Sequence, residues 1–126
     1  MYQLAVRREL PALHFLVGGD WGAENFPHSH PYVLELRLQG NQLDAHGFLV
    51  DILEVEKHLT EQVDYYRNKI LNDLPEFTGL NPSLEHFARI LAVALSERIQ
   101  AKNITMLRVV LWENEAAWAS FEIDRS

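Results

Sequence analysis

The residues of this chain best suited to chemistry lie between His14 and His30. Three of the six histidines fall in this stretch, and His28 and His30 form an H-x-H pair. Side chains alternate along an extended chain, so the two imidazoles of the pair lie on one face. Neutral imidazole is a common zinc ligand. Three histidines brought together would leave the fourth zinc position open for water or substrate, as catalytic sites require.

The same spacing also fits three surface histidines beside a glycine-rich loop. Three imidazoles accept nickel or iron as well as zinc, so the spacing does not fix the metal. The loop also carries Glu24, whose carboxylate could act as a base beside a metal or remain solvated. If Glu24 were itself a ligand, it would close the open position.

The composition narrows the class of protein. With 126 residues, 48% of them hydrophobic, we expect one domain, residues 1–126, with its own core. The net charge of −7 argues against a nucleic-acid or membrane-surface binder, which would need a basic face. No segment predicts a membrane span or a signal peptide, and cysteine is absent. We therefore expect a cytoplasmic protein without disulfides or a thiol nucleophile.

The elements that must position these residues follow from hydrophobic periodicity. Residues 2–10 and 32–39 alternate cleanly and predict two strands. Pro27 and Pro31 bracket the H-S-H segment, so the second strand is not extended through it. Residues 104–112 and 117–124 predict two further strands.

Two amphipathic helices are predicted between the strand pairs. Asp51, with Glu54 three residues later, has the form of a capping box before a helix over about 52–69. A loop follows, and Asn81 then caps a second helix, with Pro82 in its first turn. That helix ends near residues 102–103.

The predicted order is β-β-α-α-β-β, which indicates an α+β domain: a four-stranded antiparallel sheet with two helices on one face. The other face is expected to be too apolar to stand in water. It would expose Val33, Leu107, Val109, Leu111 and Trp118 in a monomer. Apolar patches and two bare sheet edges favour a homo-oligomer.

Several short motifs, taken together, resemble the 6-pyruvoyltetrahydropterin synthase and 6-carboxytetrahydropterin synthase family of the T-fold class. No single motif is specific to this family, but the order and spacing of the motifs together are. They are His14 before the loop, H-S-H at 28–30 where the family has H-G-H, G-F-L-V-D-I at 47–52, L-N-D at 71–73, N-P-S-L-E-H-F-A at 81–88, and L-W-E-N at 111–114.

The resemblance implies a T-fold enzyme that binds zinc through His14, His28 and His30. It also implies that Glu113 anchors the pterin ring, since a carboxylate can accept hydrogen bonds from the amino group and a ring N–H. Glu113 could otherwise be an ordinary hairpin residue. The implied substrate is 7,8-dihydroneopterin triphosphate, and the implied assembly is a trimer paired into a hexamer with sites between subunits.

Two positions depart from the family pattern. Glu24 stands where the family has its catalytic cysteine, and some members carry a glutamate in this loop and cleave the side chain differently. The family's Asp-His pair becomes Arg67-Asn68, or Asp64-Tyr65 with a three-residue gap. Neither alignment supplies a histidine as proton shuttle.

These departures leave three hypotheses. The first is a zinc-dependent lyase acting on dihydroneopterin triphosphate or a related dihydropterin, with Glu24 as the acid/base residue. The second is a relative that binds zinc and a pterin without turnover. The third is a structural oligomer whose histidines are incidental.

Overall fold

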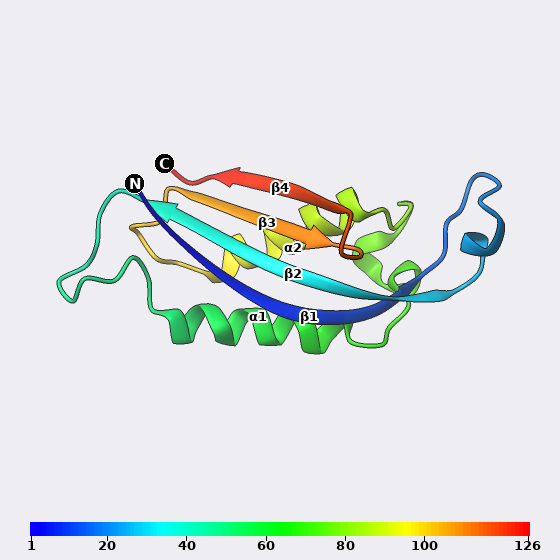
Figure 1. Cartoon of the computed structure of the whole chain (residues 1–126), viewed down its shortest axis with the longest axis horizontal. Helices are drawn as coiled ribbons and strands as arrows, with labels where there is room; N and C mark the ends of the chain where they lie inside the picture. Colours follow the sequence, from blue (N-terminus) through cyan, green and yellow to red (C-terminus); the bar gives the residue numbers. More distant parts are fainter.

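Four antiparallel strands form one continuous sheet in chain order, and both helices, which come between the second and third strands in the sequence, pack against one face of it (Figure 1). The computed structural model describes residues 1–126. The long elements are β1 (Tyr2–His14), β2 (His28–Gly40), α1 (Ile52–Tyr66), α2 (Leu84–Arg98), β3 (Met106–Trp112) and β4 (Trp118–Asp124). Three 3-10 turns, Gly22–Asn25, Leu71–Asp73 and Pro75–Phe77, lie in the connections. The predicted α+β order is confirmed.

The hydrophobic core lies between the helices and one face of the sheet. Leu36 of β2 pairs with Val109 of β3, and Leu34 pairs with Leu111. Directly paired residues share a face, so Leu107, Val109 and Leu111 point to the helices and are fully buried. The prediction that these three would lie on the exposed face was wrong, because alternation alone does not say which face of a strand the helices cover.

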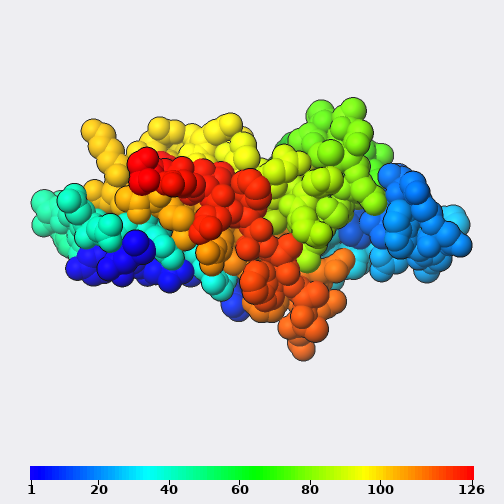
Figure 2. Space-filling view, turned by 90° about the horizontal axis from the view of Figure 1, so that it is seen from above, coloured from blue at the N-terminus to red at the C-terminus, as the bar shows by residue number.

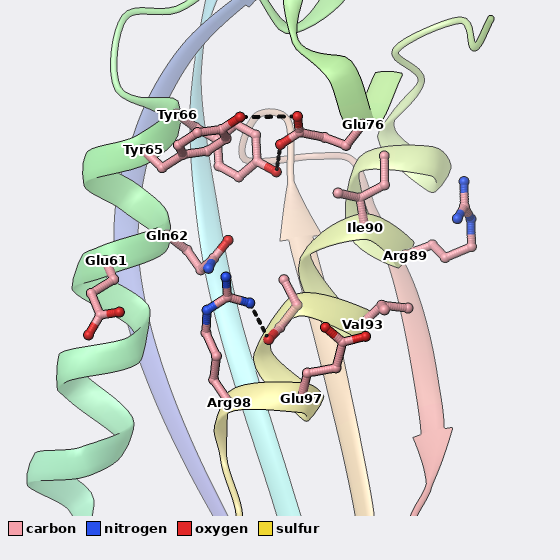
Figure 3. Close-up of a pocket in the computed structure, with 11 residues that line it drawn as sticks. Glu61, Gln62, Tyr65, Tyr66, Glu76, Arg89, Ile90, Val93, Glu97 and Arg98 are labelled. Atoms are coloured by element: carbon pink, nitrogen blue, oxygen red, sulfur yellow. Dashed lines mark hydrogen bonds between the residues drawn. The ribbon is translucent and has the colours of Figure 1, made fainter. Parts of the chain in front are cut away.

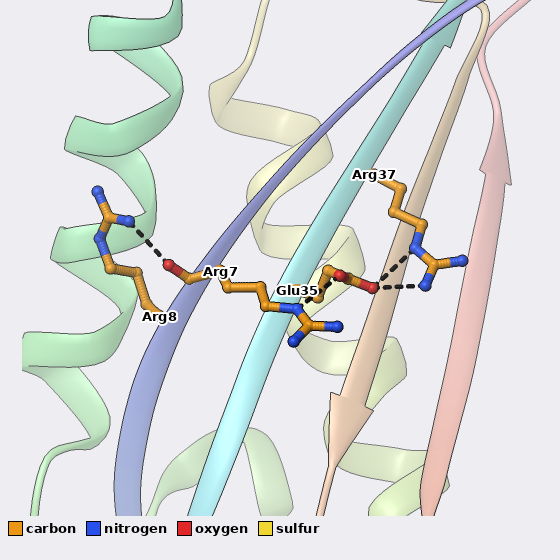
Figure 4. A network of polar contacts seen from close by, with 4 residues as sticks. All are labelled: Arg7, Arg8, Glu35 and Arg37. Atoms are coloured by element: carbon orange, nitrogen blue, oxygen red, sulfur yellow. Dashed lines mark hydrogen bonds and ion pairs between the residues drawn. The ribbon is translucent and has the colours of Figure 1, made fainter.

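The opposite face carries an ion-pair network (Figure 4). Glu35, only 5% exposed, accepts from Arg7 Nε at 2.8 Å and from Arg37 Nε at 2.7 Å. Burial would raise the pKa of the Glu35 carboxyl, but these hydrogen bonds outweigh it and hold the pKa below its ordinary value. The centre of this face is therefore more polar than predicted, although Trp118 is 54% exposed at its edge.

Both N-terminal strands are longer than predicted. The expected strands over 2–10 and 32–39 extend to His14 and back to His28, which pair directly with each other. The H-S-H segment is thus part of β2, and Pro31 lies inside the strand.

Pro31 is tolerated inside β2 because this position requires no backbone N–H to bond a neighbouring strand. Its partner across the strands is Pro11. Pro11 O accepts from Asn68 N at 2.8 Å and Leu13 N donates to Lys69 O at 2.9 Å, so these backbone groups point away from β2. The proline pair therefore occupies a position without hydrogen bonds between the two strands.

The helix boundaries are partly as predicted. Asp51 caps α1 by accepting from Leu53 N at 3.0 Å, but α1 ends at Tyr66, and Asn68 follows with a left-handed φ of 57°. The cap of α2 is Ser83, which accepts from His86 N at 3.1 Å. The predicted cap at residue 81 was wrong by two residues. Neither helix is long and apolar enough to span a bilayer.

The segment 15–27 extends from the end of the sheet opposite the two termini (Figures 1 and 2). It connects the paired ends of β1 and β2, where all three predicted ligand histidines lie.

Candidate metal centre

The strand register brings the three histidines together. His14 lies directly opposite His28, and His30 lies two residues along β2, opposite Ala12. All three side chains point to the core face. Their ring centroids are 4.6 Å apart for His14–His28 and His14–His30, and 4.8 Å apart for His28–His30. One nitrogen of each ring lies within 4.8 Å of one nitrogen of both others.

Backbone carbonyls orient two of these rings. The distance from His14 Nδ1 to Pro82 O is 3.0 Å, and from His28 Nδ1 to Phe26 O it is 2.8 Å. A carbonyl only accepts, so each Nδ1 carries the proton and each Nε2 presents a lone pair. The Nε2 atoms of His14, His28 and His30 are all buried without a hydrogen-bond partner. This donor set fits a metal ion bound by three imidazoles.

The electrostatics keep two imidazoles in the ligand form. Burial, and then the neighbouring His30 and His28, lower the pKa of His14 to about 4. Burial also lowers the pKa of His30, although the Glu113 carboxylate opposes it. Neutral imidazole is the form that binds a metal, so protons compete less with a metal at these two positions.

Tyr32 contacts both the histidine centre and the hydrophobic core. Its hydroxyl lies 3.0 Å from His14 Nδ1, and the side chain is 1% exposed. Its ring centroid lies 5.4 Å from that of His30 and 5.2 Å from that of Phe87 on α2. Tyr32 therefore restricts the orientation of His14 from the side facing α2.

Two asparagines hold the chain that leaves His14. Asn72 accepts from Phe15 N at 3.0 Å and donates to Phe15 O at 2.9 Å. Asn81 accepts from Val17 N at 3.1 Å. These contacts explain why the L-N-D and N-P-S segments belong near the centre: they hold the first residues of the loop in place.

A third asparagine organises the loop internally. Asn25 donates to Leu16 O and Gly19 O, both at 3.0 Å, and accepts from Trp21 N at 2.8 Å. Sequence reasoning missed these residues because asparagine is common in turns and caps. For the same reason the sequence predicts a helix cap at Asn81 and gives no sign of its contact with the loop.

Glu113 lies at the end of β3, beside the centre. Its Oε1 is 3.5 Å from His30 Nε2. The hairpin that presents it is closed by Asn114, which accepts from Ala116 N at 2.8 Å and Ala117 N at 3.0 Å. The L-W-E-N motif therefore combines a carboxylate with the residue that fixes its turn.

Glu24 lies in the exposed turn Gly22–Asn25 of the same loop. Its negative charge acts to raise the pKa values of His14 and His30, against the larger effect of burial, which lowers them. It also acts to raise the pKa of Tyr32, in the same direction as the larger effect of burial. The carboxylate is thus within electrostatic range of the centre. It does not belong to the group of three mutually close histidines that could hold a metal.

The segment expected to carry an Asp-His pair contributes no histidine to the centre. Asn68 donates its backbone N–H to Pro11 O, and the exposed Arg67 lies 3.7 Å from Asp64. Both positions serve the end of α1 and its contact with β1.

A family model described as 6-pyruvoyl tetrahydropterin synthase matches residues 3–124. The chain belongs to this family. A search of curated protein sequences finds no significant match.

Solved structures of family members share the fold. The 6-pyruvoyltetrahydropterin synthase of Plasmodium vivax, in a variant with alanine in place of a catalytic glutamate, matches with a TM-score of 0.82 at 16% identity, covering 98% of both chains. The Caenorhabditis elegans enzyme matches with a TM-score of 0.82 at 17% identity, covering 98% of this chain and 96% of that one. The Plasmodium falciparum enzyme gives 0.80 at 13% identity. The predicted T-fold is confirmed.

Proposed function

We propose that this family member is a zinc-dependent lyase that acts on 7,8-dihydroneopterin triphosphate or a related dihydropterin. The observation that carries the proposal is the convergence of three buried, unpartnered Nε2 atoms from His14, His28 and His30. A zinc ion held there would polarise and acidify hydroxyl groups of the substrate side chain. Imidazole ligands, in place of carboxylates, favour zinc over magnesium or calcium.

The protein's own residues would recognise the ring and move protons. Glu113 would accept hydrogen bonds from the amino group and ring N–H of the pterin, next to His30. Glu24 would remove or return a proton beside the metal, since it is exposed and its charge reaches the histidines. A relative of the same fold is described as having a catalytic glutamate, which supports a carboxylate in this role.

The test combines metal content with turnover. Purified, untagged protein should hold about one zinc per chain, and a His28→Ala/His30→Ala variant should hold none. His46→Ala is the matched control, because His46 lies in an exposed loop at the opposite end of β2. The zinc-loaded protein should convert dihydroneopterin triphosphate or dihydroneopterin, and Glu24→Gln should slow this by about 100-fold or more. No product from any dihydropterin would refute the enzyme.

One observation favours a second candidate function, pterin binding without turnover. The family's Asp-His pair becomes Arg67-Asn68, or Asp64-Tyr65 with a gap, and on either alignment the histidine that would shuttle a proton is missing. This function predicts micromolar binding of a dihydropterin that Glu113→Ala abolishes, with no product. A measurable activity that Glu24→Gln removes would exclude it.

We further propose that the chain assembles into a trimer or a hexamer of paired trimers. Trp21, Phe26 and Trp118 are exposed large apolar side chains near the ends and outer edge of the sheet. The strands β1 and β4 leave two unpaired edges. Light scattering of the purified protein should give three or six times the 14.6 kDa chain mass, whereas a monomer would contradict the assembly.

A further inference from the structure

A groove between α1 and α2 forms a second concave surface, with a volume of about 690 Å³ (Figure 3). It shares no residue with the histidine centre. Its volume lies in the range of small-molecule sites. The lining residues that carry the argument are Gln62, Tyr66, Glu76, Ile90, Val93 and Arg98.

Gln62 is a buried amide without a partner. Its side chain comes from the core side of α1, is 6% exposed, and makes no hydrogen bond within the chain. In Figure 3 the amide points into the groove. The Gln62 amide atoms are not among the side-chain atoms that are sealed from solvent without a partner, so they open into the groove and are free to bond water or a ligand. The amide offers the groove both a donor and an acceptor.

One end of the groove holds a fixed carboxylate. Glu76 accepts from Tyr66 Oη at 2.8 Å and from Tyr65 Oη at 3.1 Å. Burial, and then Glu76, raise the pKa of both phenols, so the hydroxyls stay protonated and keep donating. Each carboxylate oxygen retains a free lone pair, so Glu76 can accept another hydrogen bond from a ligand cation.

The other end of the groove holds an unneutralised guanidinium. Arg98 donates to the backbone oxygen of Ala94 at 2.8 Å and forms no ion pair within 4.0 Å of a carboxylate. Arg98 lines the same groove as Tyr66, and its charge acts to lower the pKa of Tyr66 against the larger effect of burial. The remaining N–H groups of a guanidinium are suited to a carboxylate.

The floor between these two ends is apolar. Ile90 and Val93 of α2 line it, and Val93 is 40% exposed. Three carboxylates and two guanidiniums line the whole groove, so its net charge is −1. This balance does not favour a simple anion. A ligand with one charge of each sign matches the separated carboxylate and guanidinium better.

We propose that the α1–α2 groove binds a small zwitterion of the amino-acid class with an aliphatic side chain. Its ammonium group would donate to Glu76. Its carboxylate would accept from Arg98 and from the Gln62 amide. Its aliphatic side chain would lie on Ile90 and Val93. This site is independent of the metal centre and of the proposed lyase activity.

The experiment uses L-leucine as the probe with the full-length protein, observed by saturation-transfer NMR and titrated to a dissociation constant. Two truncated probes separate the charges: 3-methylbutan-1-amine lacks the carboxylate and 4-methylpentanoate lacks the ammonium group. Each should bind about 10-fold or more weakly than leucine, because each loses a charged hydrogen bond. Equal binding of the three probes, or no saturable binding of leucine, would overturn the proposal.

Variants locate the binding on the chain. Arg98→Met, at an exposed position, should weaken leucine binding about 10-fold or more and leave 3-methylbutan-1-amine unaffected. Gln62→Leu keeps the buried volume and should also weaken leucine. Arg67→Met is the control, since Arg67 is an exposed arginine outside the groove. Leucine affinity that survives both groove variants would refute the site, whatever the metal content or activity.

Discussion

The asparagine that holds the chain after His14 can be tested for its effect on metal binding. Asn72 makes two partly buried hydrogen bonds to the backbone of Phe15, at 3.0 and 2.9 Å. Each is worth about 0.5–1.5 kcal/mol net, so Asn72→Ala removes about 1–3 kcal/mol. If metal binding must again fix the Phe15 backbone that Asn72 no longer holds, the whole loss of about 1–3 kcal/mol appears in the free energy of metal binding. The dissociation constant then rises by about 5- to 150-fold, since about 1.4 kcal/mol corresponds to tenfold.

The assay is competition with a chromophoric zinc chelator, together with thermal unfolding of the metal-free protein. Asn41→Ala is the control, because Asn41 is exposed at the far end of β2. Asn72→Asp should fall between the wild type and Asn72→Ala, since a carboxylate can still accept from Phe15 N–H but cannot donate to its carbonyl. Reduced thermal stability with unchanged zinc affinity would refute the reasoning. The two hydrogen bonds would then stabilise the fold equally with and without metal.

Three further predictions concern acid, the metal-free centre and one close contact. Burial would raise the pKa of Glu35, but its two arginines lower it below the ordinary value. The ionised carboxylate therefore stabilises the fold above about pH 4.5, and this contribution is lost as the pH falls through the folded-state pKa. Between pH 6 and 3 the melting temperature should fall more for the wild type than for Glu35→Gln. In the metal-free protein, NMR should show His14 titrating near pH 4 instead of 6.5. The unfolded chain therefore binds a proton at His14 at a higher pH than the folded chain does. The metal-free protein should accordingly lose stability as the pH falls from about 6.5 to 4. Gly40→Ala would place a Cβ against the backbone oxygen of Asn103, closer than van der Waals contact permits, and should cost about 1–3 kcal/mol in urea unfolding; an unchanged midpoint would contradict this.

The fold was predictable because its strands and helices have clear periodicity. The strand patterns over 2–10, 32–39, 104–112 and 117–124, together with the two amphipathic helices between them, predicted the order of elements. The sequence did not show which side of β3 faces the helices, since Leu107 and Val110 are both apolar and both buried. Face assignment depends on the register with β2, which is a long-range property.

The sequence also predicts that His14, His28 and His30 could come together, from their spacing and the family resemblance, and the structure places them within reach of one ion. The groups that orient them were not predictable, because two are backbone carbonyls. Pro82 O and Phe26 O could come from any residue, so no side-chain signal marks them. Asn72 and Asn81 have residue-specific roles, but their partners lie 57 and 64 positions away in the chain. Contacts of that kind become visible only once the fold is known.

The pairing of His14 with His28 places the histidines on two strands, outside the loop that joins those strands. The strands hold the histidines in place, and the thirteen residues between them enter and leave at neighbouring points. The entropy of closing such a loop changes slowly with its length, by only about 0.6 kcal/mol per doubling. Insertions, deletions or an exchange of Glu24 for another residue can therefore occur without moving the three histidines. In evolutionary terms, the loop can change while the strands keep the three histidines together, which is one way a single scaffold can give rise to several activities.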